Sequence, residues 1–391
     1  MICTPQHTVE HPASHSRGGL RLVLASIASI FVLAPSAQLH AETSSWILRD
    51  NEPSANVKPA RRQSHNQTHK TTAEAKPESL LDGPGVSQHN KFQQKFQKGP
   101  AATGIEKPAP GHDDAYLAFD QGRYLTALDL AQKLAEKGDA RAHTLIGRIH
   151  AEGLGVPKNE ALAAQWYKRA AELNDVDGMF AYGVILAEGR GVKKDRAGAA
   201  VMFERAALTG HAAANYNLGL LFLKGDGKPE NPYRAAQHIR YAAEQGIAAA
   251  QYDLATLYQN GTGVPYDAVE TSRWLRAAAE QGMAVAQYDY AVLLLKGLGL
   301  TADEPKAIEY LKAAAEKNIP GAQNRLAHVY QEGVGIKKSK AEAAKWRLIA
   351  KASGFGEDKD LDDLVASLPK AERQAAEQAA TSWREGKLLP F

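Results

Sequence analysis

The chain has 391 residues, more than one compact core usually holds, so its length indicates two domains or an elongated array. Alanine occurs 69 times and aromatic residues make up only 7% of the chain, which favours closely packed helices over a β-rich fold. A net charge of +3 argues against a basic surface for nucleic acid. Cys3 is the only cysteine, which excludes disulfide frameworks, cysteine-based zinc sites and cysteine nucleophiles from the folded part.

Residues 1–41 have the pattern of a secretory signal peptide. Arg17 and Arg21 precede the apolar run 22–34, and a segment with small residues leads from this run to Ala41. As a helix this run would span about 20 Å, which is too short for a hydrocarbon core of about 30 Å. We therefore expect cleavage after Ala41 and a periplasmic or secreted protein. The alternative is an uncleaved single N-terminal anchor in the inner membrane.

Residues 42–111 are predicted to be a disordered linker. They are rich in Pro, Gln, His, Lys, Ser and Thr and contain few large apolar residues, so they bury too little surface to offset their ordering entropy. Phe92 and Phe96 lie four residues apart in the segment 91–98, which has two interpretations: a docking or membrane-surface peptide, or an incidental aromatic pair. His65 and His69 have no third ligand nearby, so no metal site is predicted.

A repeat of 36 residues organises the chain after the linker. Six Gly-x-Gly motifs follow one another at this interval without insertion, beginning at Gly153, Gly189, Gly225, Gly261, Gly297 and Gly333. A period of this length with helical patterning is typical of a solenoid of helix pairs. In each repeat a large residue of the first helix is followed by a small one, as in Leu218-Gly219. The large side chain can fill the core, and the small residue allows the second helix to pack closely against the first.

Helix start and stop signals recur in the same frame. Before the second helix of each repeat stands a residue whose side-chain oxygen can accept a backbone N–H, namely Asn159, Asp195, Asn231, Asp267, Asp303 and Ser339. After it stands a residue that tolerates the left-handed conformation, namely Asn174, Gly210, Gly246, Gly282, Asn318 and Gly354. The predicted fold class is therefore all-α, an α/α solenoid of six helix-pair repeats.

The repeat pattern, for example residues 286–299 with the Ala-Ala pairs of the second helix, resembles the Sel1-like repeat, a relative of the tetratricopeptide repeat. The resemblance implies a right-handed superhelix. We predict that the repeats span 142–357, that a tetratricopeptide-like capping unit precedes them at 112–141, and that capping helices close the array at 358–391.

By analogy with tetratricopeptide arrays, the concave face is expected to come from the first helix of each repeat. In the middle repeats it offers apolar side chains to a protein or peptide partner, and the predicted groove residues are Phe180, Val184, Tyr216, Leu220, Leu223, Tyr252, Tyr288, Val292 and Leu295. The alternative is that these rings only pack neighbouring repeats together. The charged residues beside them, among them Lys224, Asp253, Asp289, Lys296 and Arg325, are interpreted mainly as a solvated surface.

No catalytic, cofactor-binding or metal-binding constellation is predicted. The Gly-x-Gly motifs lie between two helices rather than between a strand and a helix, so they are turns and not a nucleotide-binding fingerprint. The histidines of the repeats occupy different frame positions, and no G-x-S-x-G motif occurs. The Sel1-like proteins described as β-lactam-binding or hydrolysing resemble a cysteine-rich branch whose cysteines this chain lacks.

Three functional hypotheses follow. The first is a non-catalytic protein-binding scaffold in the bacterial cell envelope, similar to periplasmic regulators that hold the sensor domain of a membrane histidine kinase and control exopolysaccharide production. The second is an envelope assembly factor whose tyrosines stack on peptidoglycan or another polysaccharide. The third, which the sequence favours least, is a β-lactamase-like hydrolase.

Overall fold

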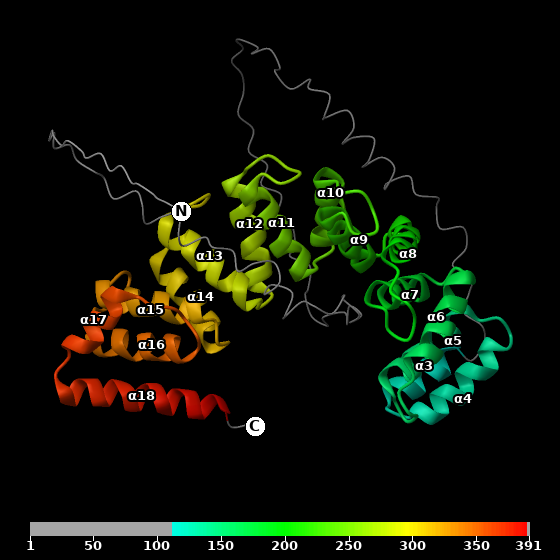
Figure 1. Cartoon of the computed structure of the whole chain (residues 1–391), viewed down its shortest axis with the longest axis horizontal. Coiled ribbons are helices and arrows are strands. Elements are labelled where there is room, and N and C mark those ends of the chain that lie inside the picture. The colour runs from blue at the N-terminus through cyan, green and yellow to red at the C-terminus, as the bar shows by residue number, and fades with distance from the viewer. Residues whose placement is uncertain (1–111, 389–391) are drawn as a thin grey trace, which may run out of the picture. The chain divides into compact units, whose positions relative to one another are not determined.

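The computed structural model describes residues 112–388, and Figure 1 shows these residues as a succession of helices from α3 to α18. The described part contains helices and no β-strand, as the sequence predicts. The predicted signal peptide (1–41) and linker (42–111), including Phe92, Phe96, His65 and His69, lie outside the described residues.

Each repeat consists of a first helix, called helix A, and a second one, helix B. The A helices are α5 (Ala140–Glu152), α7 (Val176–Glu188), α9 (Ala212–Lys224), α11 (Ala248–Asn260), α13 (Ala284–Lys296) and α15 (Pro320–Glu332). The B helices are α6 (Glu160–Glu172), α8 (Arg196–Leu208), α10 (Pro232–Glu244), α12 (Ala268–Glu280), α14 (Glu304–Glu316) and α16 (Lys340–Ala352). Each A helix packs on its own B helix, and each B helix packs on the A helix of the next repeat.

Two helix pairs flank the six repeats. α3 (His112–Asp120) and α4 (Tyr124–Ala135) precede them, and α4 packs on α5. α17 (Lys359–Ser367) and α18 (Lys370–Leu388) follow them, and both pack on α16. The edge-to-face contact between Trp346 and Trp383, with ring centroids 5.5 Å apart, attaches α18 to the last repeat.

The predicted helix signals are confirmed. All six predicted caps, including Asn231 and Asp267, accept a backbone N–H at the start of a B helix. The six predicted stop residues all have positive φ, and Asn174 and Asn318 are the non-glycine residues that adopt it among those described. The A helices begin two residues earlier than expected, at Ala140 rather than Ala142 in the first repeat.

The core lies between the A and B helices, and small residues make the close approach possible. A Cβ atom on Gly219 would lie 2.6 Å from Cγ1 of Ile239, a distance that real side chains do not tolerate. Leu218 and Ile239 are each at most 1% exposed. The predicted pairing of a large and a small residue therefore sets the spacing of α9 and α10.

Candidate functional site

The fifth residue of each A helix forms a column that reaches from one repeat to the next. In the middle of the array, the hydroxyl group of Tyr216 donates a hydrogen bond to Asp253 Oδ2 at 2.9 Å, and that of Tyr252 donates to Asp289 Oδ2 at 2.8 Å. The two tyrosines are only 5% and 6% exposed. These two rings therefore pack between neighbouring repeats, as in the second of the two interpretations of the predicted groove.

The ends of the column make the same kind of link with shorter side chains. Thr144 Oγ1 donates to Asp175 Oδ2 at 2.6 Å, and Asn324 Nδ2 donates to Asp358 Oδ2 at 2.7 Å. Asp175 caps the start of α7 and Asp358 caps the start of α17, so each donor is linked to the beginning of the first helix of the next unit. A ladder of hydrogen bonds thus runs along the A helices and adds directional contacts to the apolar packing between them.

The ladder is interrupted at Phe180, which has no hydroxyl group to donate. Its ring packs on His211, with centroids 4.6 Å apart. Asn217 occupies the frame position at which Asp253 and Asp289 stand in the next two repeats, and both polar atoms of its buried amide lack a hydrogen-bond partner. The second and third repeats are therefore joined without the tyrosine–aspartate link that joins the third repeat to the fourth and the fourth to the fifth.

The remaining predicted groove residues fall into two groups. Val184 is fully buried and Val292 is 4% exposed, so both belong to the core together with Phe180 at 7%. Four residues keep part of their surface accessible, namely Leu220, Leu223, Tyr288 and Leu295. We call these four the open set, because only they combine the predicted position with an accessible apolar side chain.

Charged groups border the open set. Lys224 and Lys296 are exposed residues one turn or less from Leu223 and Leu295, and partial burial lowers the pKa of both ammonium groups. Arg325 lies near Tyr288, where burial raises the pKa of the phenol and the positive charge opposes that shift. The face can therefore meet an apolar side chain at its centre and a carboxylate at its margin.

Asp253 and Asp289 are not merely solvated charges, contrary to the sequence-based interpretation. Burial raises the pKa of each carboxyl group to about 6, and the hydrogen bond from the tyrosine of the preceding repeat opposes this shift. The signal that could have revealed them is the recurrence of Tyr and Asp 37 residues apart, at 216 and 253 and again at 252 and 289. Side-chain periodicity within one repeat does not contain this information.

A second polar cluster was not foreseen from the sequence. Arg347 of α16 is 1% exposed, and its guanidinium donates to both carboxylate oxygens of Asp362, at 2.9 and 2.8 Å, and to Asn324 Oδ1 at 3.0 Å. His328 Nε2 lies 2.7 Å from Asp358 Oδ2. The cluster joins α15, α16 and α17, so it holds the closing helix on the last repeat.

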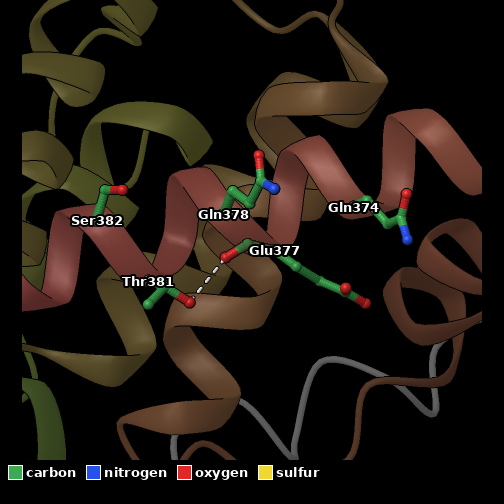
Figure 2. Close-up of a pocket in the computed structure, with 5 residues that line it drawn as sticks. All are labelled: Gln374, Glu377, Gln378, Thr381 and Ser382. Carbon is green, nitrogen blue, oxygen red and sulfur yellow. Dashed lines mark hydrogen bonds between the residues drawn. The ribbon is translucent and has the colours of Figure 1, made fainter.

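A surface pocket on α18 offers no comparable chemistry. Figure 2 shows its lining of Gln374, Glu377, Gln378, Thr381 and Ser382, all from one helix, with Thr381 Oγ1 donating to the carbonyl oxygen of Glu377 at 2.9 Å. None of the predicted groove residues lines it. Between residues 112 and 388 no cluster of three or more His, Cys, Asp or Glu residues could hold a metal ion. No helix within that range is long and apolar enough to cross a membrane.

Comparison with known proteins places the chain in a family. The Sel1 repeat model matches residues 140–175, 176–211, 212–247, 248–283, 284–319 and 320–354. The chain belongs to the Sel1 repeat family, and its fold is the α/α solenoid of that family. No curated protein sequence matches it.

Two solved structures are similar to the chain. A Sel1 repeat protein from Oxalobacter formigenes is 28% identical, with a TM-score of 0.55, and the match covers 64% of this chain and 99% of that one. A protective antigen of uropathogenic Escherichia coli displaying an SLR fold is 25% identical, with a TM-score of 0.48, and the match covers 80% of each chain. Sel1 repeat proteins are generally non-catalytic scaffolds that bind other proteins, and this chain has their solenoid architecture.

Proposed function

We propose that the chain is an exported scaffold of the bacterial cell envelope that holds a partner protein on the A-helix face of its third to fifth repeats. The observation that carries this proposal is the open set, four apolar side chains that stay partly accessible on a face whose other predicted residues are buried. Flanking Lys224 and Lys296 favour a partner segment with apolar side chains and at least one carboxylate.

The sensor domain of a membrane kinase that controls exopolysaccharide production is the partner class suggested by the resemblance in sequence. The signal-peptide pattern of residues 1–41 supports a periplasmic location for this encounter. A glycan ligand is less well supported at this face, because the rings of Tyr216 and Tyr252 are almost fully buried and cannot stack on a sugar.

Site-specific photocrosslinking tests the proposal. A photoreactive amino acid at Leu220, Leu223 or Leu295 should crosslink to one defined envelope protein in native cells, because these side chains are accessible at the proposed contact. The matched control is Leu208, which is 65% exposed on α8, and should give no such product. Equal crosslinking from Leu208, or no protein product from any of the three groove positions, would contradict the proposal.

A further inference from the structure

Exposed apolar side chains gather on a surface other than the A-helix face. The loop that joins helix A to helix B in each repeat packs on the start of helix B of the preceding repeat, and we call this surface the loop edge. A Cβ on Gly263 would lie 2.9 Å from the backbone nitrogen of Tyr233, and one on Gly299 would lie 3.0 Å from that of Val269. The apolar side chains lie at two consecutive loop–helix contacts, and their exposures are 41% for Tyr233, 68% for Tyr266, 62% for Val269 and 42% for Leu298.

The two loops at this place also lack charge. Residues 261–266 and 297–302 contain no Asp, Glu, Lys or Arg, whereas the corresponding six residues of each other repeat contain at least one. The sixth residue of each loop shows the contrast between the repeats. From the first repeat to the last it is Lys158, Lys194, Glu230, Tyr266, Ala302 and Lys338. These two loops are thus uncharged, and charged loops bound them on both sides; the nearest acidic residues are Asp267 and Asp303, which cap α12 and α14.

We propose that the loop edge of the fourth and fifth repeats binds a second copy of this chain around a two-fold axis. In such an interface the same surface meets itself, so residue i contacts residue j and j contacts i. A charge close to the axis would face its own copy, and like charges repel. Two uncharged loops with apolar side chains at the centre therefore suit self-pairing better than the lysine-bearing loops of the other repeats do.

The charges at the border fit the same arrangement. If the axis passes between the loops 261–266 and 297–302, antiparallel pairing brings Tyr266 of one copy to Ala302 of the other. One repeat further out, Glu230 meets Lys338. Both of these residues are exposed, and Lys337 adds a second positive charge beside Lys338. Asp226 and Lys228 are paired within their own chain, with Arg196 and Glu204, so Glu230 supplies the negative charge of this loop toward the second copy.

Four exposed side chains from each copy and two ion pairs in the whole dimer define a small interface, so we expect a reversible dimer with a dissociation constant of about 10 to 100 µM. Sedimentation equilibrium of the purified protein over a concentration series measures it. Tyr266→Lys combined with Val269→Lys should abolish association without lowering the thermal unfolding midpoint, because both side chains are exposed. A purely monomeric wild-type protein at several hundred micromolar, or a dimer indifferent to these two changes, would overturn the proposal.

A charge exchange tests the pairing itself. Glu230→Lys alone and Lys338→Glu alone should each weaken association about tenfold, because each places like charges opposite one another twice in the dimer. The double variant should restore association to within about threefold of the wild type. Lys194→Glu, at the same frame position but outside the proposed contact, serves as the control. Failure of the double variant to recover, or an equal effect of Lys194→Glu, would refute antiparallel pairing of the loop edge.

Discussion

At the scale of single residues, the two partly buried carboxyl groups of the ladder, Asp253 and Asp289, should make the stability of the fold depend on pH. The pKa of Asp253 and of Asp289 is about 6 in the folded protein, against an ordinary value of 3.8. Because the folded state binds these protons more tightly than the unfolded state, the contribution of each group to stability rises as the pH falls from about 7 to 4. Two pKa units correspond to at most about 3 kcal/mol for each group.

The double substitution Asp253→Asn, Asp289→Asn tests this contribution. The amide oxygen of asparagine can still accept the tyrosine hydroxyl, but it carries no charge. We expect the variant to have a higher free energy of unfolding than the wild type at pH 7.5. When the pH is lowered to 5, its free energy of unfolding should rise less, or fall more, than that of the wild type. Urea unfolding at both values measures this. A wild-type protein that is the more stable of the two at pH 7.5 would contradict the assignment of a destabilising buried charge.

His238 should act in the opposite direction within the same pH range. Its ring stacks on Phe222, and Nδ1 lies 2.9 Å from Asn215 Oδ1. Burial, assisted by the positive charge of Arg234, lowers the pKa of the imidazole from 6.5 to about 4. The contribution of the neutral ring to folding stability is therefore fully present above pH 6.5, the pKa in the unfolded state, and is lost as the pH falls toward 4. The loss amounts to about 3 kcal/mol.

The two carboxyl groups mask this effect in the wild type, so the variant lacking both charges is the appropriate background. In that background the unfolding free energy should fall between pH 6.5 and 4. Adding His238→Gln should remove this fall, although it lowers stability at pH 7.5 through loss of the stacked ring. A slope that persists after the histidine is replaced would assign the titration to another group.

At the scale of the elements, the second glycine of each Gly-x-Gly motif is a contact point as well as a turn. Gly227 has φ of 84°, and a Cβ there would lie 2.3 Å from the carbonyl oxygen of Arg196 at the start of α8. Gly122 has φ of 71° but no neighbour within 4 Å. Comparing the two positions separates backbone strain from steric conflict between repeats.

We predict that Gly122→Ala costs about 1 kcal/mol, the usual strain of a left-handed alanine. Gly227→Ala should cost at least about 2 kcal/mol more, because the loop must move away from α8. Urea unfolding midpoints of the two variants provide the measurement. Similar losses at the two positions would mean that the loop does not hold the preceding repeat.

Local signals explain why the elements could be predicted while part of the candidate site could not. Asn231 and Gly246 mark the beginning and end of α10 through the backbone geometry of their own neighbourhood, so the sequence suffices. Tyr216 has the same apolar spacing whether it lines a groove or packs on the next repeat. Its burial depends on how α9 and α11 approach one another, which the sequence of one repeat does not specify.

At the scale of the whole molecule, the array is a sum of similar neighbouring contacts, so entire repeats should be removable in frame. Deleting residues 248–283 joins Ile247 to Ala284 and places α13 after α10. Tyr216 then faces Asp289 as it previously faced Asp253, because the two aspartates are 36 residues apart. The shorter protein should keep the helicity per residue of the parent and unfold cooperatively. Its free energy of unfolding should depend less steeply on urea concentration, because less surface is exposed on unfolding.

Deleting residues 212–247 provides the matched comparison, because it removes the same number of residues but a different link. Phe180 would then face Asp253 and could not donate to its buried carboxylate, so this variant should be less stable than the first by about 1 to 3 kcal/mol. Introducing Phe180→Tyr into the second deletion should recover most of the difference. Equal stability of the two deletions, or no recovery with tyrosine, would show that the ladder of hydrogen bonds does not determine which repeats can stand next to each other.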